Sequence, residues 1–96
     1  ESPFYEIIIR VNNPSQSKLY LNVGCGDDCQ GNVLLPTESL KVWTSLNVPV
    51  SCLIKDGLNH SSIQARSVFV SPDPMSFDLH SVIIKDGPME GMQVNC

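Results

Sequence analysis

The sequence has little charge, and positive charge is the scarcest. Its 96 residues include only six lysines and arginines, the charged fraction is 17%, and the net charge is −4. Nucleic acids and anionic membranes are bound by clusters of basic side chains, and the sequence has no such cluster. We therefore expect neither a nucleic acid nor an anionic membrane as a partner. The basic residues are scattered over the chain, at Arg10, Lys18, Lys41, Lys55, Arg66 and Lys85.

Long apolar runs are also missing. No run approaches the roughly 18 apolar residues of a membrane-spanning helix, so no membrane span is predicted. A hydrophobic fraction of 42% with few charges is typical of a folded chain and not of a disordered tail. We expect one domain over residues 1–96. The chain begins at Glu1 without a signal peptide, which favours a processed, mature secreted protein.

Residue patterns of known catalytic sites are absent as well. The chain has no Gly-x-Ser-x-Gly elbow, and its histidines, His60 and His80, fall in a predicted loop and on the polar side of a predicted strand. Asp27 and Asp28 leave a calcium site open as a minor alternative, although their spacing does not match an EF-hand loop. We predict that the protein is not an enzyme and needs no cofactor or metal ion.

Four cysteines predict two disulfides. An even number of cysteines in a short secreted chain is typical of disulfide bonds. A zinc site favours two closely spaced pairs, and here only Cys25 and Cys29 are close, whereas Cys52 and Cys96 stand alone. On the residues alone, all three pairings of the four cysteines stay open.

Apolar and polar residues alternate through most of the chain, which is the pattern of half-buried strands. The inward positions of the first two segments are Tyr5, Ile7, Ile9 and Val11, then Leu19, Leu21, Val23 and Cys25. Phe4, Glu6, Ile8 and Arg10 share the other face of the first segment and are expected to point outward. Further strands are expected over residues 48–55, 62–71, 77–85 and 91–96, with turns at Asp56-Gly57 and Asp86-Gly87. The predicted fold class is all-β: a small antiparallel β-sandwich of six to seven strands, stapled by two disulfides.

Residues 36–46 fit either of two elements. If the segment is a strand, Trp43 points outward, and the inward residues are Leu40, Val42, Thr44 and Leu46. As a helix, it begins at Pro36. We favour the strand, because residues 42–44 are strand formers and Pro49 ends the segment too early for a long helix.

The outward aromatic residues predict a binding surface. If the segments around residues 18–25 and 40–46 pair as a hairpin, Tyr20 and Trp43 share one outer face with Lys18 and Lys41. Aromatic and cationic side chains together are typical of binding hot spots, so we predict that these four residues bind a partner. Two alternatives stay open: Trp43 is covered by a loop or lies in the core, and the exposed strand edge accepts a partner strand.

The triplet Asn59-His60-Ser61 is an N-glycosylation sequon. It follows the turn expected at Asp56-Gly57, where a glycan would be accessible. Asn59 is therefore predicted as a glycosylation site.

Three stretches carry a family resemblance: Leu21-Asn22-Val23-Gly24-Cys25, then residues 38–43, then residues 82–87 followed by Gly91 and Cys96. Together they resemble the MAX effector family of plant-pathogenic fungi, which includes ToxB-like toxins. The resemblance implies a sandwich of two three-stranded antiparallel sheets. It also implies secretion by a fungus during infection and binding to host proteins without catalysis. By position, it implies the disulfides Cys25–Cys96 and Cys29–Cys52.

We therefore expect a secreted fungal effector or toxin-like protein that binds a host or extracellular protein, with translocation into the host as an option. A secreted inhibitor or antimicrobial protein is the first alternative, because the loop over residues 70–77 contains prolines that suit a rigid inhibitory loop. An Ig-like adhesion module is the second, because Cys25, Trp43 and Cys52 follow the order of an Ig domain.

Overall fold

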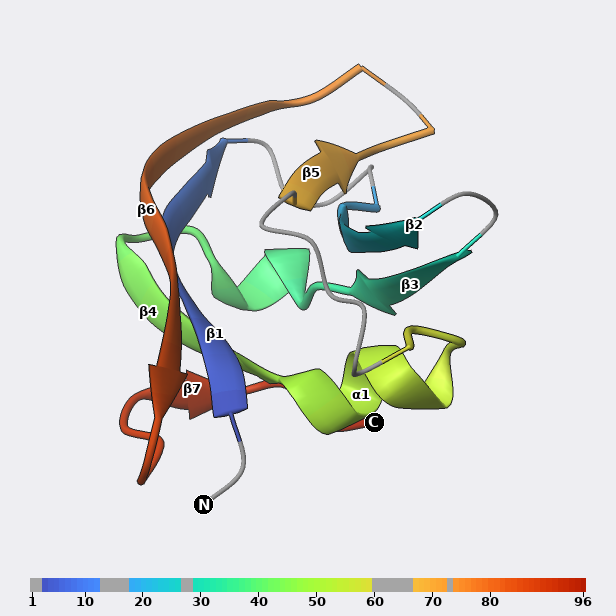
Figure 1. Cartoon of the computed structure of the whole chain (residues 1–96). Coiled ribbons are helices and arrows are strands. Elements are labelled where there is room, and N and C mark those ends of the chain that lie inside the picture. Colours follow the sequence, from blue (N-terminus) through green and yellow to red (C-terminus); the bar gives the residue numbers. More distant parts are fainter. Residues whose placement is uncertain (1–2, 13–17, 27–28, 60–66, 73) are drawn as a thin grey trace.

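The computed structural model describes residues 3–12, 18–26, 29–59, 67–72 and 74–96, and its fold is a two-layer β-sandwich (Figure 1). Within these residues, one layer is a four-stranded sheet in the order β6-β1-β4-β7 and the other a three-stranded sheet in the order β3-β2-β5. The predicted all-β sandwich is therefore confirmed. The first sheet has one strand more than the two three-stranded sheets implied by the effector resemblance. Three predictions, on Asp27 and Asp28, on His60 and on the strand residues 62–66, lie outside the described residues.

The four-stranded sheet is built around β1. Its strands are β1 (Pro3–Asn12), β4 (Thr44–Pro49), β6 (Ser76–Asp86) and β7 (Met92–Gln93). β1 pairs antiparallel with β4 and β6, whereas β7 runs parallel to β4. The antiparallel three-stranded sheet consists of β2 (Tyr20–Gly26), β3 (Cys29–Leu34) and β5 (Ser67–Val70). A short 3-10 turn, η1 (Thr37–Ser39), precedes β4, and a helix, α1 (Val50–Lys55), follows it.

The core lies between the two sheets and is built from the alternate positions expected from the sequence. All eight inward residues of the first two segments are buried: Tyr5, Ile7, Ile9, Val11, Leu19, Leu21, Val23 and Cys25. Burying a large aliphatic side chain contributes roughly 1.5–3 kcal/mol. These two strands therefore supply much of the stability of the sandwich and leave Glu6, Ile8 and Arg10 of β1 for its outer face. The expectation for Phe4 is wrong, because this residue at the start of β1 is buried and only 2% exposed.

The strand predicted within residues 36–46 is confirmed only from Thr44, where β4 begins, and the alternative helix does not form, because a short turn follows Pro36. The N–H groups of Ser39 and Leu40 donate to the carbonyls of Pro36 and Thr37 at 2.9 and 3.0 Å, so the backbone is bonded within the turn and not to a strand. The turn brings Leu40 into the core, and the Leu40 carbonyl accepts a hydrogen bond of 2.7 Å from the N–H of Val11. The chain then leaves the core, so that Val42 is 70% exposed although it was expected inside.

The strand predicted over residues 48–55 ends at Pro49 and continues as α1. Pro49 has no N–H for the strand ladder, and its φ of −59° suits the start of a helix. The helix turns Val50 and Leu53 into the core. The sequence Asp56-Gly57, predicted as a hairpin turn, ends this helix instead, and Gly57 has a φ of +118° that favours glycine.

Helix α1 packs against β3 at Gly31. A Cβ atom on Gly31 would lie 2.6 Å from the carbonyl oxygen of Leu53, so this close approach requires glycine. Just beyond the helix, the Asp56 carboxylate accepts a hydrogen bond of 2.7 Å from the N–H of Asn32. These two contacts fix α1 on the edge of the three-stranded sheet.

The chain has the two predicted disulfides, but they are Cys25–Cys29 and Cys52–Cys96. The pairing implied by the effector resemblance, Cys25–Cys96 with Cys29–Cys52, is wrong. Cys25 and Cys29 lie on the neighbouring strands β2 and β3, with Cα atoms 5.1 Å apart. Cys52 lies on α1, and its Cα is 5.8 Å from that of Cys96 in the segment that follows β7. The pairing thus follows from which segments are neighbours in the sandwich.

Loss of the Cys52–Cys96 bond should destabilise the fold more than loss of Cys25–Cys29. The two bonds span 44 and 4 residues, and a cross-link removes more entropy from the unfolded chain when it closes a longer loop. We expect Cys52→Ser with Cys96→Ser to lower the free energy of unfolding by about 4 kcal/mol, and Cys25→Ser with Cys29→Ser by about 2 kcal/mol. Urea unfolding measures both losses, and an equal or reversed order would contradict the expectation.

Candidate binding surface

Trp43 lies on the outer face of the four-stranded sheet, directly before β4. Its side chain is 47% exposed, so it neither belongs to the core nor lies under a loop. The guanidinium of Arg10, from the outer face of the neighbouring β1, lies over the ring with its Cζ atom 5.0 Å from the ring centroid. A cation–π contact of this kind contributes about 0.5–1 kcal/mol at an exposed site and orients the ring.

Arg10 is itself held by Asp78, which lies opposite it on β6. The Nη2 and Nε atoms of Arg10 donate to the Oδ2 atom of Asp78 at 2.7 and 3.2 Å. The hydrogen bond from Arg10 is the largest cause that lowers the pKa of Asp78 below its usual value of 3.8. Desolvation raises this pKa, but by less than that hydrogen bond lowers it. The positive charge of Arg10 and a hydrogen bond from Asn12 lower it further. The guanidinium is thus fixed between a carboxylate and an aromatic ring.

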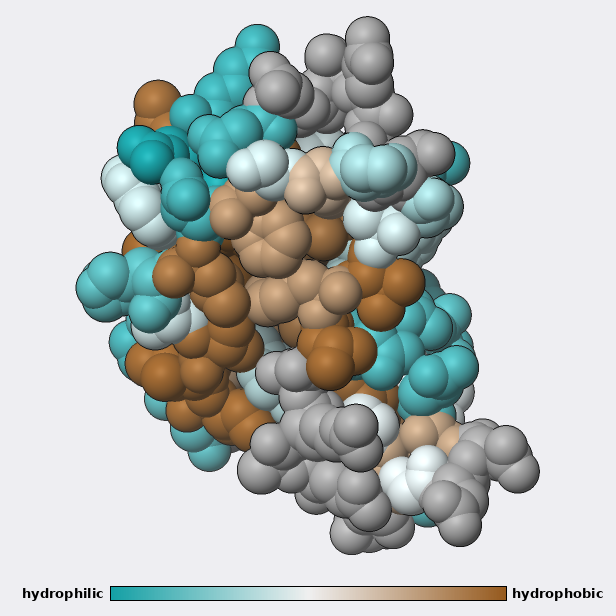
Figure 2. All heavy atoms as spheres, turned by 90° about the horizontal axis from the view of Figure 1, so that it is seen from above, coloured by the Kyte–Doolittle hydropathy of each residue, from teal (hydrophilic) through white to brown (hydrophobic). Residues whose placement is uncertain are grey.

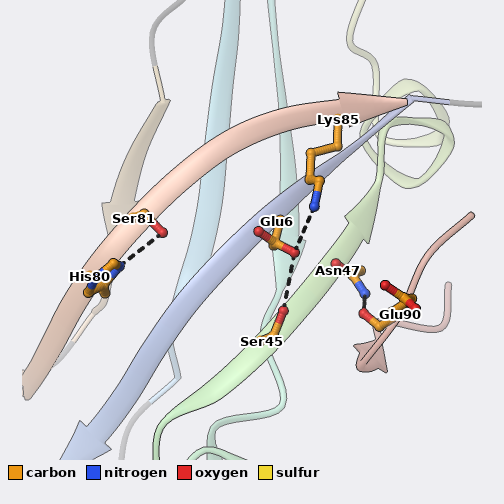
Figure 3. Close-up of polar contacts among 7 residues, drawn as sticks. All are labelled: Glu6, Ser45, Asn47, His80, Ser81, Lys85 and Glu90. Carbon is orange, nitrogen blue, oxygen red and sulfur yellow. Dashed lines mark hydrogen bonds and ion pairs between the residues drawn. The ribbon is translucent and has the colours of Figure 1, made fainter. Parts of the chain in front are cut away.

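A second ion pair lies on the same outer face, where Glu6 of β1 meets its neighbours on both sides (Figure 3). The Oε2 atom of Glu6 accepts hydrogen bonds from the Nζ of Lys85 at 3.3 Å and from the Oγ of Ser45 at 3.5 Å. His80 and Ser81 lie farther along β6, with the Nδ1 and Oγ atoms 3.3 Å apart. Hydroxyl, carboxylate and amine groups therefore lie side by side on three adjacent strands.

We call this region the Trp43 surface. It comprises Glu6, Arg10, Trp43, Ser45, Asp78 and Lys85. Its two acidic and two basic side chains pair with each other, so that the surface has no net charge. An exposed aromatic ring beside paired polar groups suits a ligand that is polar but uncharged.

Tyr20 does not share this surface, which corrects the predicted grouping. The expected hairpin between the second and third segments does not form, because β2 pairs with β3 and β5 in the other sheet. There Tyr20 lies between Leu34 of β3 and Val70 of β5 on the outer face. The physical reason is that β3 takes one edge of β2 and β5 takes the other, so that no edge of β2 is left for β4.

The two predicted lysines both lie outside the strands. Lys18 precedes β2, Lys41 precedes Trp43, and both are exposed. Lys41 is near Trp43 in the chain, and the binding roles expected for Lys18, Lys41 and Tyr20 stay predictions.

Asn59, the predicted glycosylation site, is exposed, and its backbone N–H donates to the Sγ of Cys25 at 3.3 Å. Its glycosylation also stays a prediction.

Apolar side chains gather on the face seen in Figure 2, on the side of the molecule where β5 and β6 lie (Figures 1 and 2). The rings of Phe69 on β5 and Phe77 on β6 have centroids 5.4 Å apart and pack against the core. This contact joins the edges of the two sheets. Val68, Val70 and Leu79 remain exposed beside it.

Sequence reasoning missed Arg10 and Asp78, which position the Trp43 ring. The available signal was the alternation in β1, which points Arg10 outward. Asp78 lies 68 residues farther along the chain, and its meeting with Arg10 depends on the register between β1 and β6. That register shifts at a bulge between Ile8 and Ile9, so it could not be read from alternation alone.

Residues 4–84 match a family model described as galactose-binding domain-like (Exop_C). The chain belongs to this family. No curated protein and no solved structure matched the chain. The family match agrees with the sandwich architecture and does not address the resemblance to MAX effectors, which stays a prediction.

Two further findings concern only the part of the chain that the structure describes. No helix in it is long and apolar enough to cross a membrane. No group of three or more His, Cys, Asp or Glu side chains in it is placed to hold a metal ion.

The ion pair with Arg10 predicts how Asp78 titrates. Because the folded pKa of Asp78 is lowered, the pair stabilises the fold above the ordinary carboxyl pKa, and this stabilisation is lost as the pH falls through the lowered value. Replacing Arg10 by methionine should raise the pKa of Asp78 toward its usual value, as measured by an NMR titration of side-chain carboxyl carbons. An Asp78 pKa that does not respond to Arg10→Met would show that another group causes the shift.

Proposed function

We propose that this domain is a secreted, non-catalytic binding module that recognises an uncharged carbohydrate through the Trp43 surface. The observation that carries the proposal is the half-exposed Trp43 ring, oriented by Arg10 beside two ion pairs that are satisfied within the protein. Membership of the galactose-binding-like family supports a sugar as the ligand class. Secretion is supported by the two disulfides, which persist in oxidising compartments.

The Trp43 ring supplies the apolar part of such a site. One face of a pyranose ring carries several C–H groups, which pack on an aromatic ring and bury apolar surface of both partners. Arg10 covers one face of the indole at 5.0 Å, so the sugar would stack on the exposed remainder of the ring. Because Arg10 and Asp78 already fix the ring, little side-chain entropy would be lost on binding.

The paired polar groups supply the hydrogen bonds. A sugar hydroxyl both donates and accepts, and the Trp43 surface offers carboxylate acceptors on Glu6 and Asp78 and a guanidinium donor on Arg10. Hydrogen bonds to charged groups are the stronger kind, about 1.5–3 kcal/mol each. Each charged side chain of the Trp43 surface is already paired within the protein. An ionic ligand would therefore find no unpaired charge of the opposite sign there.

A glycan array followed by fluorescence titration tests the proposal. Trp43 is the only tryptophan of the chain, so its intrinsic fluorescence reports directly on the proposed site. We expect an uncharged glycan to bind and to change this fluorescence. Trp43→Ala should then weaken binding at least about tenfold, as expected for a central aromatic contact.

Val42→Ala is the matched control for Trp43→Ala. Val42 is the adjacent residue and is more exposed, so its truncation leaves the fold and the ring in place. We expect this variant to bind with unchanged affinity. Carbohydrate binding that survives Trp43→Ala, or that is lost equally in Val42→Ala, would contradict the proposed site.

A second proposal keeps the function expected from the sequence: a fungal effector that binds a host protein. The same surface favours it, because Trp and Arg are enriched among the side chains that dominate protein interfaces. Ionic strength distinguishes the two proposals. Binding of an uncharged glycan should change less than about twofold between low and high salt, because screening acts only on charged partners.

A host protein recognised through Arg10, Asp78 and Lys85 should instead bind more weakly as salt rises. Titrations at two salt concentrations, with the array-selected glycan and with candidate host proteins, measure the difference. A strong salt dependence of glycan binding would contradict recognition of an uncharged ligand.

A further inference from the structure

A groove separates the free edges of the two sheets, on the side away from β5 and β6. Two adjoining cavities of about 450 and 410 Å³ form it. β3 lies along one wall and residues 92–96 along the other, with α1 at one end and η1 at the other. We call it the edge groove, and its lining includes Asn32, Leu34, Leu35, Met92, Val94 and Asn95.

The backbone of β3 faces this groove. The N–H of Asn32 points away from β2 and donates to Asp56 at 2.7 Å. Backbone groups of alternate residues point to the same side of a strand, so the N–H and C=O of Leu34 also point away from β2. Leu34 lines both cavities, and its side chain is 48% exposed. Beyond the end that α1 covers, β3 therefore presents the N–H, the C=O and the apolar side chain of Leu34 at an open edge.

The opposite wall presents its backbone in the same way. The N–H of Val94 donates to the carbonyl of Asn47 on β4 at 2.9 Å. Because directions alternate within β7, the backbone groups of Gln93 point away from β4, on the side of the groove that Gln93 lines. An extended chain between the walls would find hydrogen-bonding groups on both of its sides.

We propose that the edge groove binds an extended, uncharged peptide segment of a partner protein as an added strand. Strand addition uses the backbone groups of an open sheet edge for affinity and side-chain pockets for specificity. The lining leucines and Val94 suit apolar side chains at alternate positions of the peptide. The charges at the α1 end favour an uncharged occupant, because Lys55 and Asp56 are opposite in sign and already bound to Cys96 and Asn32.

The wall made by residues 92–96 is held in place by contacts at several points. The Nδ2 of buried Asn47 donates to the carbonyl of Glu90 just before this segment (Figure 3). The Cys52–Cys96 disulfide fastens its far end to α1, and the Nζ of Lys55 donates to the Cys96 carbonyl at 3.3 Å. Peptide binding should therefore depend on this disulfide, because its loss frees one wall.

The edge groove shares no residue with the Trp43 surface, so either proposal can be contradicted without affecting the other. Trp43→Ala should leave peptide binding unchanged. Variants of the groove should leave the binding of the array-selected glycan unchanged.

Selection of a displayed library of uncharged random hexapeptides against the intact domain, in its oxidised form, tests the groove. Enriched peptides are then mapped by proton–nitrogen NMR correlation spectra. We expect sequences that alternate apolar and polar residues, with the largest shifts at the amides of Leu34, Gln93 and Asn95. Methylation of the peptide nitrogens that face the walls should abolish binding, because it removes the donors.

Leu34→Ala should weaken the selected peptide about tenfold, as truncation of a central contact does. Val70→Ala is its control, since Val70 is 46% exposed in the same sheet but lies on the strand farthest from the groove. Cys52→Ser with Cys96→Ser should also weaken binding. No enriched peptide, shifts outside the groove, or occupation of the groove by a neutral oligosaccharide would overturn the proposal.

Discussion

The pairing of β1 with both β4 and β6 is the constraint on which the core and the Trp43 surface depend. The inward residues of β1, among them Ile7 and Ile9, are fully buried between the sheets. Its outward residues Glu6 and Arg10 then lie between the side chains of the two neighbouring strands. A shift of β1 by one residue would expose the core residues and would also break both ion pairs. Stability and the candidate site are therefore fixed by one register.

The elements that could be predicted from the sequence are those with one face in the core. The alternation in β1 and β2 predicted their positions, because a half-buried antiparallel strand needs such a pattern. Helix α1 was not predicted, because a short apolar run such as residues 48–55 fits a strand as well as a buried helix. Pro49 was the available signal, because it ends the ladder and begins the helix. In residues 36–46, the contact between Leu40 and Val11 decided the path, and it is visible only in the fold.

The candidate site was predicted in part. The exposure of Trp43 was predicted correctly, but from an alternation that fails at the neighbouring Val42. Its partners Arg10 and Asp78 meet only through the register of β1 and β6. Tyr20 was grouped with Trp43 on the assumption of a hairpin that the pairing of β2 with β3 excludes. The disulfide pairing taken from the effector resemblance failed for a similar reason, because the neighbours of Cys25 and Cys96 are set by strand order. The features that sequence patterns did not predict are thus the contacts between segments that are distant in the chain.

The most direct measurement of the central claim is a crystal structure of the domain with the glycan selected from the array. The account predicts a sugar ring stacked on Trp43, with its hydroxyls bonded to side chains of the ion pairs on the outer face of the four-stranded sheet. A glycan bound elsewhere, with Trp43 still exposed to solvent, would contradict it.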